Sequence, residues 1–558
     1  MFLFFKLSVS SIYKADFDTL RVFSTRIISN SPENPDLDPI FHNNCSVDEI
    51  IAISKGQNIF DVFSNTTYTE TLMNIEFDID LKPKIYCKSS FSDEDINKYI
   101  DIIHRNYFHE YVIEDYAFWV PIGFVQYDET YIYTHITFNL YEYNNFLINC
   151  NATASNPIRI QENNKITFSY SAKWTSTYKR SQNEFPASLK YNVRSKSILG
   201  IISQILALIG LLSNIFYLRT KYRIQRENKN RDSLFEPEED DGFSNMVCRE
   251  ASSIPKNNAI LSAISGNGIH ILLSTFAFSI VSFNDKFYSN GIPVFFTFIG
   301  FLIALSHLSG FCSIFISAIF DNRDWKFISI LHIVFRSIIS FVTVVIYNFP
   351  SLFKKEISSN SLFSIPILFE LLLVFYTPLT IFGAYLCSIL YPFRMINAPN
   401  QSKISLTKES PILLQSYFIA TVITTVIYVL FKKEFKMFCL AYSENQFSSF
   451  FKLLAIYVAI FFSVMTLIGS LSIPFLFHYN CFRWHWRVAI LGIIPGIVFL
   501  VMSSLTVFSN DFITKSQKVS FIALLFAVSC GISVSGSAIS FLSALLTVRL
   551  TFSLGKVE

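Results

Sequence analysis

The sequence predicts a polytopic α-helical membrane protein, with nine transmembrane helices and a β-rich domain at its N-terminus. The first observation is composition: of 558 residues, 51% belong to the set AVILMFWYC and only 16% are charged, against about 25% in a typical soluble domain. The second is distribution, because long apolar runs begin only after Ser195. Together with a mean hydropathy of +0.40, this excludes a soluble, collagenous or disordered chain. The net charge of +3 gives no electrostatic case for a nucleic-acid partner.

Nine apolar runs follow Ser195, each long enough for the ~20 residues that a helix needs to cross a bilayer. They are residues 197–218, 258–283, 292–319, 327–349, 362–390, 412–431, 451–477, 488–508 and 520–548. The runs are apolar on all sides, whereas surface helices of a soluble protein keep a polar face. The main alternative is that one pair is fused or split. We therefore expect a first span, a charged loop at 219–257, a bundle over 258–548 and a tail at 549–558.

Basic residues predict the orientation of the spans, since Lys and Arg collect in cytoplasmic loops. If residues 1–195 lie outside the cytoplasm, the cytoplasmic segments hold 17 Lys and Arg and the opposite loops hold 8. The N-terminal domain is thus predicted to be lumenal and the C-terminus cytoplasmic. Residues 1–13 (MFLFFKLSVSSIY) would form a weak signal segment, because they are few and Lys6 interrupts them. The alternatives are an unusual signal and a true start further upstream.

The predicted lumenal domain carries three glycosylation candidates, Asn44, Asn65 and Asn151, each in an Asn-X-Ser/Thr sequon. A fourth sequon, at Asn400, falls on the cytoplasmic side and is expected to stay unmodified. Four cysteines lie in lumenal segments, and their pairing cannot be read from the sequence. These are Cys45, Cys87, Cys150 and Cys439. No CxxC and no His/Cys spacing suits a metal, so no cofactor is expected.

Periodicity within this domain predicts one helix and several strands. Ser92 and Asp95 resemble a capping box, and apolar residues then recur at helical spacing over 92–111. Residues 130–141 and 165–175 alternate and are rich in Tyr, Ile and Thr, which is typical of strands. His104 and His135 are isolated, so we interpret them as structural or surface residues and predict no catalytic set.

Several segments resemble the nonaspanin family, whose members have nine spans and a large lumenal domain. Within the N-terminal domain, YSAKW (170–174) resembles the family's YSVKW strand, and YIYTHITF (131–138) its YLFTHKHF-type strand. Further matches follow in order: the acidic run 236–241 before Gly242-Phe243, the SIPKN segment (253–257), GNGIH (266–270), PLTIFGAYL (378–386), Pro392 to Pro399, RWHWR (483–487) and the terminal KVE (556–558). The matches run from about residue 85 to the end, and several substitutions mark a divergent member.

The resemblance implies a sorting role. It implies a Golgi and endosomal protein that helps to localise other membrane proteins, is recycled by a vesicle coat complex and has no catalytic activity. Lys556 and Glu558 match the family's C-terminal KxD/E signal, and paired charge contacts are how a coat protein reads such a pattern. If the family resemblance is set aside, the tail is interpreted as an ordinary polar end after a transmembrane span. Client transmembrane helices, the coat and the lipid bilayer are the expected partners.

Polar groups inside the spans are costly and are functional candidates by default. The main candidates are Asn267, His270, Arg336 and Glu370, with further ionisable or amide groups at His307, His332, Gln204, Asn214 and Gln415. Our first hypothesis is that Arg336 and Glu370 pair within the bundle. The alternatives are a polar recognition surface and an ion path.

Two further features have a structural and a functional interpretation. Arg483, Trp484, Trp486 and Arg487 are expected to anchor a helix end among lipid headgroups. The small residues of 266–268 and 531–538 fit either client helices or internal helix contacts.

Two other functions remain open beside sorting. A transporter or channel would show inverted repeats with broken helices, and no convincing repeat is present, although Pro366, Pro378, Pro474 and Pro495 could break helices. An enzyme would need facing reactive groups at the membrane surface, and no such cluster is evident.

Overall fold

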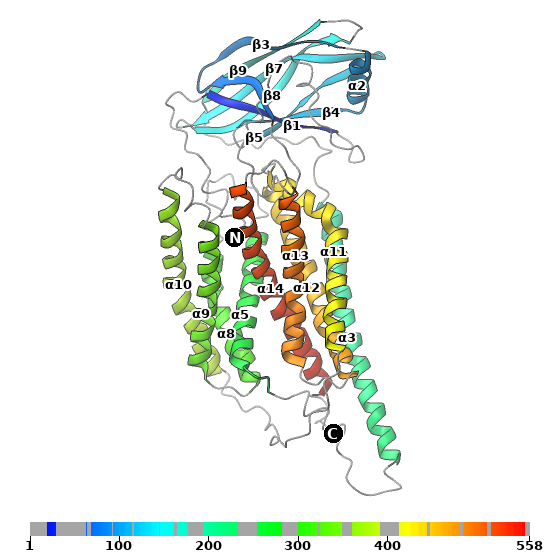
Figure 1. Cartoon of the computed structure of the whole chain (residues 1–558), viewed down its shortest axis with the longest axis vertical. Coiled ribbons are helices and arrows are strands. Elements are labelled where there is room, and N and C mark those ends of the chain that lie inside the picture. Colours follow the sequence, from blue (N-terminus) through cyan, green and yellow to red (C-terminus); the bar gives the residue numbers. More distant parts are fainter. Residues whose placement is uncertain are drawn as a thin grey trace. The chain divides into compact units, whose positions relative to one another are not determined.

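The computed structural model describes two compact units, one β-rich and one helical (Figure 1). The backbone is described for residues 19–29, 63, 69–91, 93–113, 116–143, 146–160, 165–176, 193–232, 254–281, 300–320, 324–348, 360–390, 412–443, 447–478, 484–509 and 515–552. Within these ranges some side chains are not described, chiefly those of 193–200, 222–232, 339–348 and 360–373. One unit comprises chiefly Val193–Glu434 and Phe451–Glu558, and the other Phe5–Asn192 with Phe435–Phe450.

The described residues of the N-terminal unit form two sheets and the helix α2 (Asp93–His104). One sheet has the order β2-β1-β4-β5; the other has β3-β9-β7-β6, with β8 also paired to β7. The strands are β1 Thr19–Ser29, β2 Thr69–Glu76, β3 Leu81–Ser90, β4 Tyr107–Ile113, β5 Tyr116–Pro121, β6 Gly123–Gln126, β7 Glu129–Tyr143, β8 Phe146–Arg159 and β9 Lys165–Ser176. The strand pairs of the described residues are antiparallel, except that β7 and β9 are parallel. One core cluster takes residues from both sheets, among them Val22 and Phe138, so the sheets pack face to face.

The structure confirms the two strands predicted at 130–141 and 165–175, which are β7 and β9. It shortens the predicted helix 92–111 to α2, Asp93–His104. Asn106 has a positive φ of 52°, the left-handed conformation that commonly ends a helix. Tyr107 then begins β4 and pairs with Ser29 of β1. Helical spacing could not reveal that the helix ends at His104, because Tyr107 continues the apolar pattern of the helix although its backbone belongs to β4.

A buried ion pair lies inside the first sheet. Arg26 on β1 and Glu110 on β4 are 8% and 2% exposed, and Arg26 Nε donates to Glu110 Oε2 at 2.9 Å. The hydroxyl of Thr25 also donates to this carboxylate. Burial of a single charge would be costly, whereas the paired and hydrogen-bonded carboxylate is compensated.

In the part of the chain that the structure describes, nine helices overlap the nine predicted spans. They are α3 Val193–Asp232, α5 Asn258–Val281, α8 Ser306–Ile319, α9 Trp325–Asn348, α10 Asn360–Leu390, α11 Ile412–Ser443, α12 Phe447–His478, α13 Trp484–Phe508 and α14 Lys515–Phe552. Within the described residues, six helices are long and apolar enough to cross a membrane, and two shorter apolar helices lie at Val374–Leu390 and Ala420–Val429. The predicted fold class is thereby confirmed.

The first span, α3, is joined to α12 by polar side chains. Gln204 Nε2 donates to the carbonyl of Ala459 at 2.6 Å. Asn214 Nδ2 donates to the carbonyl of Ser470, and also to its Oγ at 3.0 Å. Pro474 lies four residues after Ser470 inside α12 and has no N–H for that carbonyl. Asn214 therefore supplies the hydrogen bond that the proline removes.

Replacing Asn214 with Leu is expected to lower the melting temperature of the full chain in detergent. The free energy of unfolding should fall by about 1–2 kcal/mol, because the Ser470 carbonyl would stay buried without a donor. In a Pro474→Ala background the restored backbone N–H can bond this carbonyl, so the same change should cost less. Leu212→Ala, at a 55% exposed position of α3, is the control. Equal costs of Asn214→Leu in both backgrounds would contradict the interpretation.

Candidate functional site: a polar centre in the helix bundle

Asn267 is positioned on α5 by the glycines on either side of it. A Cβ on Gly266 would lie 1.9 Å from Ser313 Oγ of α8, and a Cβ on Gly268 would lie 2.3 Å from the Val534 carbonyl of α14. Only glycine permits these two approaches. The small residues of 266–268 are thus internal helix contacts, and α5 is held against two other helices at the level of Asn267.

His332 of α9 is the hub of a hydrogen-bonded network and is fully buried, as is Asn267. Asn267 Nδ2 donates to the carbonyls of Ala263 (3.0 Å) and His332 (3.2 Å), and it lies 3.3 Å from His332 Nδ1. His332 Nε2 faces Ser309 Oγ at 2.8 Å and the hydroxyl of Tyr376 at 3.0 Å.

Two serines of α8 complete the surroundings of His332. Ser313 Oγ lies 2.7 Å from Nδ1, and Ser309 Oγ donates to the Gly266 carbonyl of α5 at 3.2 Å. Ser309, Ser313 and Tyr376 were not among the predicted site residues. A Ser pair at i, i+4 in an apolar run was the available signal, but such serines usually bond their own helix, as Ser313 also does to the Ser309 carbonyl at 3.0 Å.

His270 lies one turn from Asn267 and bonds to an interruption in the next span. That span runs over Gly300–Ile319 and is broken at Leu305, where φ is −86° and ψ is 0°. Side chains donate hydrogen bonds to the three backbone carbonyls before the break, those of Leu302, Ile303 and Ala304. His270 Nε2 donates to Leu302 (2.8 Å), Ser306 Oγ to Ile303 (2.6 Å) and His307 Nδ1 to Ala304 (2.6 Å). Backbone bonding resumes at Ser309, whose N–H donates to the Leu305 carbonyl at 3.4 Å.

Four buried polar atoms of α5 have no hydrogen-bond partner among the described residues: Ser265 Oγ, Asn267 Oδ1, His270 Nδ1 and Ser274 Oγ. All four side chains are at most 1% exposed. Since buried polar atoms are nearly always bonded, this part of the centre retains capacity to accept hydrogen bonds.

Arg336 places a positive charge beside the same network. Its Cζ lies 5.9 Å from the centroid of the Tyr376 ring, a cation–π distance. On α9 the exposed residues Phe327, Ile330 and Val334 form one stripe, and helical spacing places Arg336 on the opposite face. The charge therefore faces the bundle, where intramembrane ionisable groups are usually found. The side chain of Glu370 lies outside the described side chains.

Among the described residues, the predicted interfacial anchors of α13 do not belong to this network. Trp484 was expected at the lipid headgroups but is 1% exposed inside a core cluster, where its ring lies 5.8 Å from that of Phe541. Trp486 is partly buried, and its Nε1 donates to the Lys256 carbonyl at 2.7 Å. Arg487 is partly buried in α13. Five candidate residues lie outside the described residues: Asn44, Asn65, Arg483, Lys556 and Glu558.

The segment Gly531–Ala538 of α14 forms an internal contact. A Cβ on Gly536 would lie 2.3 Å from the Gly492 carbonyl of α13, and Ser529 Oγ donates to the Gly496 carbonyl at 2.6 Å. These small residues let α13 and α14 approach closely.

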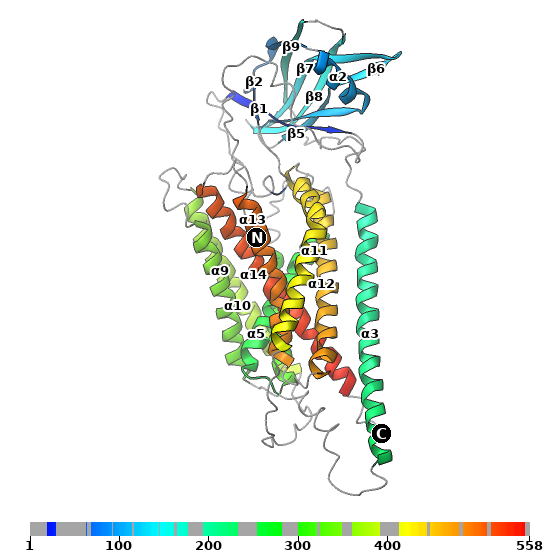
Figure 2. The same ribbon diagram turned by 45° about the vertical axis from the view of Figure 1, so that its right-hand side comes forward.

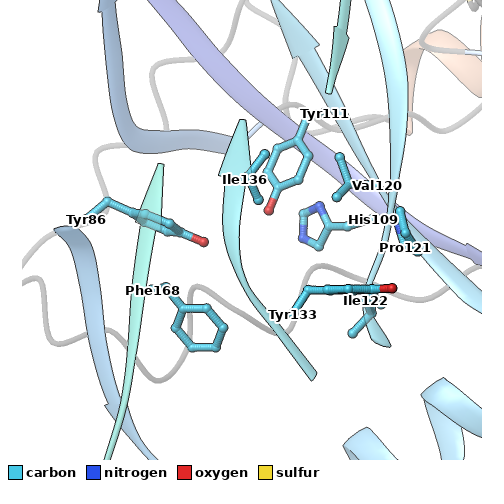
Figure 3. A pocket seen from close by; sticks show the side chains of 9 residues that line it. All are labelled: Tyr86, His109, Tyr111, Val120, Pro121, Ile122, Tyr133, Ile136 and Phe168. Atoms are coloured by element: carbon cyan, nitrogen blue, oxygen red, sulfur yellow. The ribbon is translucent and has the colours of Figure 1, made fainter. Parts of the chain in front are cut away.

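The N-terminal unit contains a small cavity between its sheets (Figure 3). Its volume is about 20 Å³, room for one water molecule. His109 and the hydroxyls of Tyr86 and Tyr111 point into it, and burial raises the pKa of both tyrosines, so they stay protonated. The cavity is too small for a solute. No group of three His, Cys, Asp or Glu in the described residues could hold a metal.

The two predicted histidines of this unit have structural surroundings. His104 is exposed in the last turn of α2. His135 is 8% exposed, and its two ring nitrogens lie 2.8 Å from Ser169 Oγ and 2.9 Å from Ser171 Oγ of β9. Burial lowers the pKa of His135. Asn151 lies half-buried in β8.

Replacing Asn267 with Leu is expected to destabilise the bundle by about 1–2 kcal/mol, measured as a lower melting temperature of the full chain in detergent. The change removes the amide that holds the Nδ1 side of His332. Ile280→Ala, at a 45% exposed position of the same helix, is the matched control. An unchanged melting temperature for Asn267→Leu would show that the network does not stabilise the bundle.

The pairing of Arg336 with Glu370 remains a prediction. Trp325 faces Tyr385 and His332 faces Tyr376, so α9 and α10 run antiparallel and Arg336 is level with about residue 373. Glu370 is then roughly 4.5 Å further along the axis. Arg336→Glu and Glu370→Arg should each lower the amount of folded protein, and the double exchange should restore it. No rescue by the double exchange would reject the pair.

The comparisons with known proteins agree with the sequence motifs. A family model described as Endomembrane protein 70 matches residues 41–516, which includes residues 41–80, where no motif was recognised. Transmembrane 9 superfamily member 5 of Arabidopsis thaliana is 25% identical over 261 residues, covering 42% of this chain and 43% of that protein. Member 3 of the same plant is 19% identical over 291 residues, covering 49% of each.

The chain thus spans about half the length, or less, of these two curated relatives, and no solved structure matches it. The family model, in contrast, covers most of the chain. The chain belongs to the endomembrane protein 70 family, the nonaspanins.

Proposed function

We propose that this protein sorts and localises other membrane proteins by binding their transmembrane helices, and that it has no catalytic activity. The observation that supports the proposal is the unused hydrogen-bonding capacity of the polar centre at Asn267 Oδ1 and His270 Nδ1. Both side chains are buried, so a client helix with polar or small residues would reach them by displacing a neighbouring helix, and lipid offers it no competing hydrogen bond.

The proposed orientation has the N-terminal unit in the lumen and the C-terminus in the cytoplasm. Cys87 is disulfide-bonded, and its partner lies outside the described residues. Disulfides persist in oxidising compartments, which supports a lumenal location of this unit. Among the other lumenal candidates, Cys150 and Cys439 are buried thiols.

Two arginines anchor helix ends on the proposed cytoplasmic side. Arg219 of α3 donates twice to the Leu550 carbonyl of α14, through Nε at 3.0 Å and Nη2 at 2.8 Å. Arg549 Nη2 donates to the Ile319 carbonyl of α8 at 3.0 Å. Cations are favourable at helix C-termini, and these bonds fix the point from which the tail leaves the bundle.

We further propose that Lys556 and Glu558 form a coat-binding signal that retains the protein in the Golgi. In cells, the full chain with a tag inserted in the 219–257 loop and a free C-terminus is expected in the Golgi. Lys556→Ala/Glu558→Ala should move it to a later compartment, because both charge contacts are lost. Val557→Ala keeps both charges and is the control. The same location for wild type and the double variant would reject the signal.

A transporter is the second candidate function, and the break at Leu305 favours it. In membrane transporters, interrupted helices commonly line the substrate site, and here the break adjoins His270 and the polar centre. Purified protein in liposomes separates the two functions. Solute or ion flux that Asn267→Leu abolishes would favour transport, whereas span-dependent co-purification of membrane clients without flux would favour sorting.

A further inference from the structure

The turn between β6 and β7 holds a tyrosine in a conformation that suits glycine. Gln126 pairs with Glu129, so Tyr127 and Asp128 form a two-residue hairpin loop. Their φ values are 51° and 63°. Such loops strongly prefer Asn-Gly, Asp-Gly or Gly-Gly, and a bulky residue with positive φ is a conformational outlier. Folding alone would therefore favour another residue than tyrosine at this position.

Packing does not explain Tyr127 either. The side chain is 90% exposed, so its burial contributes almost nothing to stability. Figure 2 shows β6 at the margin of the N-terminal unit. Strained residues that nothing in the core requires are concentrated at binding and catalytic sites, which points to a role for the ring in contact with another molecule.

The strands behind the turn form a pre-organised aromatic surface. Phe124 of β6 stacks on Tyr131 of β7, with ring centroids 5.2 Å apart and an interplanar angle of 10°, and it lies 5.5 Å from the ring of Tyr133. Glu129 is held from two sides: Tyr131 donates its hydroxyl at 2.9 Å, and Arg159 Nη1 lies at 2.8 Å. Tyrosine and arginine on such a rigid surface are typical of binding hot spots.

The charge of the turn indicates the partner. Arg159 neutralises Glu129, whereas no described basic side chain pairs with Asp128, which is exposed. The tip therefore combines an electron-rich ring face with a net negative charge. A Lys or Arg side chain can bind both groups, through a cation–π contact with the Tyr127 ring and an ion pair with the Asp128 carboxylate.

We propose that the tip formed by Tyr127 and Asp128, backed by Phe124 and Tyr131, is a docking site for a basic segment of a partner protein. The aromatic ring and the carboxylate select Lys or Arg, and the stacked strands keep both in place. This proposal does not depend on the sorting role.

The test uses the full chain in phosphatidylcholine nanodiscs and a fluorescein-labelled peptide of alternating Lys and Ser, read by fluorescence anisotropy. The wild type should bind this peptide and not its Glu/Ser counterpart. Tyr127→Gly and Asp128→Asn should each weaken binding roughly two- to fivefold, as expected for one exposed cation–π or ion-pair contact. The melting temperature of Tyr127→Gly should be equal or higher, because glycine fits the positive φ.

Asp93→Asn, at an exposed carboxylate in the first turn of α2, is the matched control and should bind like the wild type. Unchanged affinity of Tyr127→Gly would overturn the proposal. Equal binding of the Glu/Ser peptide would also overturn it, as would variant-sensitive binding of a neutral oligosaccharide in place of the Lys peptide, which would assign the surface to a glycan.

Discussion

Backbone carbonyls that lose their helical partner inside a bilayer must find another donor, because hydrocarbon supplies none. This requirement organises the helical unit. Pro474 leaves the Ser470 carbonyl without an N–H, and Asn214 of α3 donates to it. The break at Leu305 leaves three carbonyls to side chains, one of which, His270, comes from α5. In both places a helix irregularity is tolerated because a different helix supplies the hydrogen bond.

The polar centre follows from the same constraint. His270 bonds to the break in the third span, and Asn267, one turn away on α5, bonds to His332 of α9. Ser309 and Tyr376 in turn lie at hydrogen-bond distance from His332 Nε2. The glycines beside Asn267 permit the close approach, since a side chain at either position would collide with α8 or α14. The hydrogen-bonded network therefore depends on the small residues, because these let the helices approach closely enough for the bonds to form. Arg336 adds a charge to this polar site.

The N-terminal unit is stabilised differently, by the burial of a core between two sheets. Two sheets bury a shared core, and the charged pair Arg26–Glu110 is accepted within it because each charge has its partner. Where the chain turns in solvent, at Tyr127 and Asp128, local preference and structure disagree. Local and global preferences usually agree in a natural sequence, and exceptions are expected at functional positions. The turn is the clearest such exception among the described residues.

The sequence by itself located the apolar helices of the bundle and the strands β7 and β9. These depend on local composition and periodicity, and hydrocarbon thickness sets the length of a span. It also identified Asn267, His270 and Arg336 as candidates, because polar groups are rare inside spans. Only the tertiary structure decided that Ser309, Ser313 and Tyr376 belong to the same site, that Trp484 is buried in the core, and that the helix after Asp93 ends at His104. The physical reason is that these outcomes depend on contacts between segments far apart in the chain, such as Asn267 with His332 or Tyr107 with Ser29. No local pattern carries that information.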